Sequence, residues 1–126
     1  MVDALTAPHE GVVAAESAHI NVHEAGAVEA CGHKVLPLPS HDGKIDPAEL
    51  KTYVEDFYSD DTREHMVAPG VVYLSQPTEY GTIYSLSELE HIKAICKSRD
   101  IRLYIDGARL GYALAAECND VQLKDL

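Results

Sequence analysis

Short apolar runs alternate with longer amphipathic or polar segments along the whole chain, and this alternation constrains the fold more than any other feature. Each run is five or six residues long and rich in aliphatic side chains, which is typical of strands buried in a parallel sheet. The four runs are residues 11–15, 34–39, 71–75 and 101–105. Because helix-length segments separate them, we predict an α/β fold with a mainly parallel sheet and flanking helices.

Two of the intervening segments begin with strong helix-start signals. Asp46 can cap the first turn, Pro47 suits the first helical position, and Glu49 can complete a capping box. Ser85 and Glu88 have the spacing of a second capping box. Apolar residues follow at helical spacing, namely Leu50, Tyr53, Val54 and Phe57 after the first signal and Leu89, Ile92 and Cys96 after the second.

Two further helices are predicted at residues 19–31, with Gly32 as the stop signal, and from residue 110 to 116. The run at 34–39 contains Pro37 and Pro39, which cannot donate to a sheet ladder. That strand is therefore expected at the periphery of the sheet.

The composition argues against several classes of function. The 126 residues suffice for one domain or part of one, and ten basic against 21 acidic residues give a net charge of −11. Such a charge opposes binding to nucleic acid or to anionic membranes. No apolar run is long enough to span a bilayer, and the start of the chain does not resemble a signal peptide, so a cytoplasmic location is expected. Three cysteines, Cys31, Cys96 and Cys118, are expected to be buried thiols of a reducing compartment.

Polar residues follow three of the predicted strands. Glu16, Ser17 and His19 follow the first, residues 76–81 follow the third, and Asp106 with Arg109 follows the fourth. The carboxyl ends of parallel strands share one edge of a sheet, where open α/β proteins bind their ligands. We therefore predict that these clusters converge on one site.

Each cluster also has a simpler interpretation. Asp106 before a glycine is commonly a turn or a cap, residues 76–78 also suit a turn, and Arg109 can pair with Asp106 or Glu117 on the surface. His19 can be a capping or packing residue near a helix start.

A metal site is not expected. His19 and His23 share a helix face, but Glu24 lies on the wrong side of them for the zincin pattern and no third ligand is evident. The remaining histidines are expected to be solvated: His9, His33, His41, His65 and His91.

Three segments together resemble the threonine aldolase and aromatic amino acid β-eliminating lyase family. They are residues 19–26 (HINVHEAG), 76–81 (QPTEYG) and 106–109 (DGAR), in the family's order. The resemblance runs over essentially the whole chain. It implies the central part of a large domain of the pyridoxal-phosphate-dependent, transferase-like fold (fold type I).

The resemblance also implies roles for individual residues. Asp106 would bind the pyridine nitrogen of pyridoxal phosphate and keep it protonated, and His19 would stack on the cofactor ring. Arg109 would bind the carboxylate of the amino acid substrate, and Thr78 would contact the cofactor side of the pocket. His19 and Glu79 would be the catalytic residues, because Glu79 stands in a loop where many threonine aldolases carry a proton-transferring histidine.

Two segments of the family pattern are not found in these 126 residues. One is the glycine-rich phosphate-binding loop expected upstream of His19. The other is the downstream Ser/Thr-rich loop with the lysine that binds the cofactor covalently, since the only later lysine, Lys124, lies in a different context. We therefore expect residues 1–126 to be a partial cofactor-binding domain that is inactive alone.

The resemblance implies that the intact parent cleaves a β-hydroxy amino acid into glycine and an aldehyde. It also implies a small-molecule amino acid substrate and a homo-oligomeric parent. One alternative is β-elimination within the same family, because fold and cofactor do not fix the reaction. Another is a non-catalytic interaction fragment, since an incomplete parallel sheet exposes edges that can pair with another chain. A generic nucleotide-binding domain is disfavoured, because no glycine-rich fingerprint follows any strand.

Overall fold

All four predicted apolar runs form strands of one parallel sheet in the computed structural model, which describes residues 1–126. The strands are β1 (Glu10–Ala15), β2 (Val35–Leu38), β3 (Ala68–Ser75) and β4 (Arg102–Asp106), arranged in the order β2-β1-β3-β4. All three strand pairs are parallel, which confirms the predicted class. The proline-containing strand β2 lies at one edge, as expected, and β4 forms the other.

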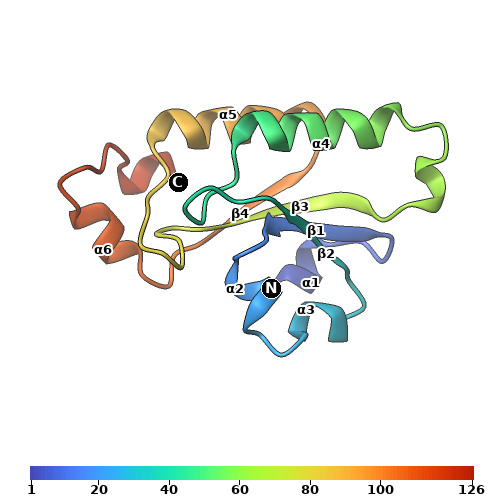
Figure 1. The fold of residues 1–126 in the computed structure, drawn as a ribbon, viewed down its shortest axis with the longest axis horizontal. Helices are drawn as coiled ribbons and strands as arrows, with labels where there is room; N and C mark the ends of the chain where they lie inside the picture. Colours follow the sequence, from blue (N-terminus) through green and yellow to red (C-terminus); the bar gives the residue numbers. More distant parts are fainter.

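Helices cover the sheet on both faces (Figure 1). The two long helices, α4 (Pro47–Ser59) and α5 (Leu86–Ser98), run side by side over one face. Three four-residue helices lie on the opposite side: α1 (Val2–Leu5), α2 (His19–Val22) and α3 (Ala27–Ala30). Helix α6 (Leu110–Ala115) and the 3₁₀ turns η1 (Arg63–His65) and η2 (Leu123–Asp125) complete the chain. None of the helices combines the length and apolar character that crossing a bilayer requires.

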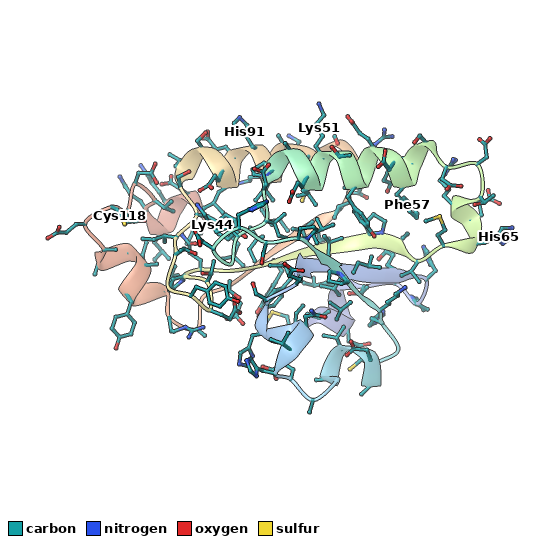
Figure 2. All side chains as sticks on the ribbon, in the orientation of Figure 1. Lys44, Lys51, Phe57, His65, His91 and Cys118 are labelled. Carbon is teal, nitrogen blue, oxygen red and sulfur yellow. The ribbon has the colours of Figure 1, made fainter.

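The core lies between the central strands and the two long helices. Strands β1 and β3 supply side chains with no exposed surface, and Leu50 and Val54 of α4 and Ile92 of α5 pack onto them as the helical spacing predicts. Tyr53 is only half-buried. Figure 2 shows Phe57 pointing from α4 toward the sheet, whereas Lys51 lies on its outer side.

The predicted capping box of α5 is present. The Ser85 hydroxyl accepts a hydrogen bond from the Glu88 backbone N–H, and the Glu88 carboxylate accepts one from the Ser85 N–H at 2.7 Å. Lys44 also donates to both oxygens of Glu88. Partial burial opposes ionisation of Glu88, but the hydrogen bonds from Lys44 and Ser85 outweigh it and lower the pKa of Glu88.

Replacing Ser85 by alanine is expected to destabilise the chain by about 1 kcal/mol, because one N–H in the first turn of α5 loses its acceptor. Urea unfolding of Ser85→Ala measures the loss. Ser87→Ala is the matched control, since Ser87 lies exposed in the same turn. Equal unfolding midpoints for the two variants would show that the cap contributes nothing.

The start of α4 follows the prediction only in part. Asp46 caps the helix by accepting a hydrogen bond from the Ala48 N–H at 2.6 Å. Glu49 does not complete a capping box, because its carboxylate bonds to the His41 ring at 3.2 Å instead. The local spacing could not show that the loop before the helix brings His41 within reach.

The predicted single helix over residues 19–31 is wrong. The segment forms two short helices, α2 and α3, with a break at residues 23–26. Ala25 and Gly26 have φ of 51° and 71°, in the left-handed region that interrupts a right-handed helix. Gly32, at φ 92°, does follow the end of α3 as predicted.

Strand β3 begins at Ala68, three residues before the predicted start at residue 71. The added residues include Pro69 and Gly70, residue types that are uncommon inside strands. Their position is tolerated because β4 pairs with β3 only from Val71 onward, and the β1–β3 register shifts between Gly11 and Val12.

Two expectations about side-chain exposure are also wrong. Cys31 and Cys118 are exposed, and only Cys96 is buried. His33 is buried rather than solvated, because its ring bonds to the Glu10 carbonyl and the Asp3 carboxylate, both at 3.2 Å. These contacts join residues far apart in the sequence, which composition cannot reveal.

Candidate functional site

The strand order places a topological switch point between β1 and β3. The chain leaves β1 for β2 on one side, while β3 and β4 add on the other side of β1. Connections that follow β1 and β3 therefore diverge and leave a crevice at the carboxyl ends of these strands, where α/β sheets bind ligands. The three predicted polar clusters all follow strands that end at this edge.

Asp106 is the last residue of β4, and its carboxylate is held on two sides. The register pairs Ser75 with Asp106 and Tyr73 with Tyr104, so Tyr73 lies diagonally across from Asp106 on the same face. The Tyr73 hydroxyl donates a hydrogen bond to Asp106 Oδ2. Asp106 Oδ1 accepts another from the Ala108 N–H at 2.9 Å. The carboxylate is thus fixed in place without a neighbouring cation.

Tyr73 is buried and remains a hydrogen-bond donor. Burial of its ring, followed by the hydrogen bond to Asp106, raises the pKa of the Tyr73 hydroxyl far above its usual range. Sequence reasoning missed this residue because it lies inside an apolar run. Its only signal is its position, two residues before the end of a strand that neighbours β4.

Glu79 joins the loop after β3 to the start of α2. Its Oε1 accepts hydrogen bonds from the His19 backbone N–H and the Ser75 hydroxyl, both at 2.8 Å. The base of this loop is closed by Gln76, whose side chain accepts from the Tyr84 N–H and donates to the Tyr84 carbonyl. The polar clusters that follow β1 and β3 therefore meet, as the parallel sheet predicts.

The His19 ring lies at the surface of this edge. Its Nδ1 pairs with Glu24 across the break between α2 and α3, and its centroid lies 5.3 Å from that of His23. The side chain remains 47% exposed.

Thr78 and Arg109 lie apart from the Asp106 carboxylate. Thr78 is buried beneath Gly43, and its hydroxyl bonds to that of Thr82 at 2.6 Å. Arg109 precedes α6, is exposed, and lines a separate hollow of about 230 Å³ with Tyr112. The structure therefore joins His19 to Glu79 by a hydrogen bond, whereas neither Thr78 nor Arg109 makes a hydrogen bond or ion pair with the Asp106 carboxylate.

A cavity of about 310 Å³ opens beside Asp106. Residues of α1, α2 and α3 and two tyrosines of the sheet line it, and among its polar walls are Asp106, Glu24 and His33. Its volume falls at the lower end of the range for small-ligand sites. Glu24 connects it to the His19 ring.

A larger groove of about 940 Å³ lies between α4 and α5, on the opposite face of the sheet. Exposed charged residues such as Lys51 and His91 border it. It contains none of the polar residues at the strand ends. We therefore place the candidate site at the smaller cavity, where convergent polar groups and a strand edge coincide.

Comparisons with known proteins agree on one group. A family model described as beta-eliminating lyase matches residues 1–125. The chain is 37% identical over 114 residues to the low specificity L-threonine aldolase of Pseudomonas aeruginosa, covering 89% of this chain and 32% of that protein. It is 34% identical over 119 residues to the enzyme of the same name from a Pseudomonas species, covering 90% of this chain and 32% of that protein.

Solved enzyme structures also superpose on this chain. The structure of a Leishmania major threonine aldolase superposes with a TM-score of 0.89 at 44% identity, covering 98% of this chain and 35% of that one. A pyridoxal-phosphate-bound C–S lyase from Staphylococcus hominis has a TM-score of 0.61 at 18% identity, over 83% of this chain and 25% of that one, and supports the fold alone. The chain spans about a third of the length of the curated relatives it matches most fully.

Proposed function

Because this chain belongs to the beta-eliminating lyase family, we propose that it forms part of a pyridoxal-phosphate-dependent lyase of the threonine aldolase type. The intact protein would cleave the Cα–Cβ bond of a β-hydroxy amino acid and release glycine and an aldehyde. The observation that carries this proposal is the fixed Asp106 carboxylate at the end of β4, beside a cavity lined by residues of β3 and β4.

The residues present fit such a cofactor. A pyridine nitrogen needs an anionic partner held in place, and Asp106 is held by Tyr73 and its own turn. A planar ring needs a flat partner, and the partly exposed His19 ring could supply one. When bound, pyridoxal phosphate supplies an electron-withdrawing ring that stabilises negative charge at the α-carbon of the substrate.

We propose that Glu79 accepts the proton of the substrate hydroxyl group. Its Oε1 is occupied by His19 and Ser75, while its Oε2 makes no hydrogen bond. Glu79 Oε2 would accept the hydroxyl proton as the aldehyde carbonyl forms. Arg109 would bind the substrate carboxylate through its fork of donors, and Thr78 would support the cofactor side of the pocket.

We further propose that residues 1–126 are a partial cofactor-binding domain, inactive alone, of a homo-oligomeric cytoplasmic protein. The two exposed free thiols, Cys31 and Cys118, are compatible with a reducing compartment. Strand β4 forms an edge of the sheet, and its unpaired backbone groups could pair with another segment of the intact protein.

The intact protein is expected to bind pyridoxal phosphate and to convert L-threonine to glycine and acetaldehyde. The measurement is the absorbance of the bound cofactor, followed by product analysis with and without added cofactor. Ammonia and a 2-oxo acid in place of glycine would favour the alternative, β-elimination, which the family description supports. Absence of cofactor binding would contradict both and favour a non-catalytic interaction role. Aldol cleavage by the purified 126-residue chain would overturn its proposed inactivity.

A further inference from the structure

The orientation of the Asp106 carboxylate depends on a side chain from a different strand. Its own turn supplies only the Ala108 N–H, which approaches Oδ1. Oδ2 is held by the hydroxyl of Tyr73, which lies 33 positions earlier in the chain. The carboxylate can therefore keep one orientation only while β3 and β4 keep their register.

The Tyr73 ring is itself held in place. The residue is 4% exposed, and its ring stacks on that of Tyr104 with centroids 5.5 Å apart and planes inclined by 30°. A buried, stacked ring has little freedom to turn its hydroxyl away. The donor is thus set in position before any ligand arrives.

In the Tyr73–Asp106 pair, the tyrosine hydroxyl is the hydrogen-bond donor and the carboxylate is the acceptor. The Tyr73 hydroxyl donates its proton to a hydrogen bond with Asp106 Oδ2 and stabilises negative charge on that oxygen. The hydrogen bonds from Tyr73 and from the Ala108 N–H together stabilise negative charge on the two oxygens of this carboxylate. A proton shared with a ring nitrogen therefore lies nearer the nitrogen when Tyr73 donates than when it does not.

Resting on the proposed function, we propose that Tyr73 is a positioning residue that aims the Asp106 carboxylate and holds the shared proton on the pyridine nitrogen of the cofactor. Tyr73 acts through Asp106 and needs no contact with the substrate. Its role differs from packing, because phenylalanine would fill the same space and keep the stack on Tyr104.

The test uses the intact protein loaded with pyridoxal phosphate labelled with nitrogen-15 in the ring. Tyr73→Phe is expected to move the ring-nitrogen resonance toward the value of neutral pyridine, and to weaken cofactor retention by roughly tenfold. Tyr53→Phe is the matched control, because it removes a tyrosine hydroxyl from α4, on the opposite face of the sheet from the cavity beside Asp106. It should leave the resonance and the retention unchanged.

A second comparison separates positioning from loss of structure. In an Asp106→Asn background, Tyr73→Phe is expected to cause no further change in the ring-nitrogen resonance, because the negative charge that Tyr73 would orient toward the nitrogen is already absent. Equal resonances for Tyr73→Phe, Tyr53→Phe and the unmodified protein would overturn the positioning role while leaving the cofactor assignment intact. Additive effects in the double variant would also overturn it. An unmodified protein that retains no pyridoxal phosphate would overturn the proposed function and this role together.

Discussion

Replacing Asp106 by asparagine in the intact protein is expected to lower the rate of amino acid cleavage by about 100-fold or more. Asparagine has nearly the same shape and can still accept the hydrogen bond from Tyr73, so the fold should persist. What it lacks is the negative charge that would pair with a protonated ring nitrogen. The measurement is kcat/KM with saturating cofactor, together with the absorbance spectrum of the bound cofactor.

Asp100→Asn is the matched control for this prediction. Asp100 lies exposed in the connection before β4, at the opposite end of that strand from Asp106. Its φ of 56° is one that asparagine also tolerates. The control should therefore retain full activity. If Asp106→Asn were as active as Asp100→Asn, the carboxylate at the end of β4 could not be the group that pairs with the cofactor.

Leu50→Ala is expected to destabilise the chain by about 2–5 kcal/mol. Leu50 has no exposed surface and fills the space between α4 and the sheet, so its removal leaves a cavity in the main core. A loss of this size is a large fraction of the stability of an ordinary domain. Urea unfolding followed by circular dichroism measures it as a lower midpoint with an unchanged slope.

The next residue provides the control. Lys51 lies on the outer side of α4 with 62% of its side chain exposed, and its contact with Glu55 spans 3.7 Å (Figure 2). Lys51→Ala is therefore expected to change the stability by no more than about 0.5 kcal/mol. A loss as large as that of Leu50→Ala would mean that the change reflects the helix itself and not the packing beneath it.

The parts of the fold that could be predicted from the sequence are those that depend on neighbouring residues. The Ser85 box, the Asp46 cap and the buried face of α5 follow from spacings of three or four residues. The break between α2 and α3 could not be predicted in this way. It arises from the left-handed conformations of Ala25 and Gly26, which the apolar spacing of that segment does not encode.

The same distinction applies to the candidate site. Asp106 and Glu79 stand at strand ends, so a parallel sheet predicts that they approach one another. Tyr73 and His33 could not be found in this way, because their partners come from distant parts of the chain. For Tyr73 the decisive fact is the register of β3 against β4, which only the folded chain supplies.

The amide of Gln76 separates the loop after β3 into a fixed base and a free tip. The Gln76 amide bonds to Tyr84 at the base, and Glu79 is held by His19 and Ser75, whereas Tyr80 at the tip is 68% exposed. A fluorescent label attached at position 80, once Cys31 and Cys118 are replaced, would sit next to the strand edge without loosening the amide contacts below it. The loop thus offers a place from which the arrival of a small molecule at this edge can be followed in real time.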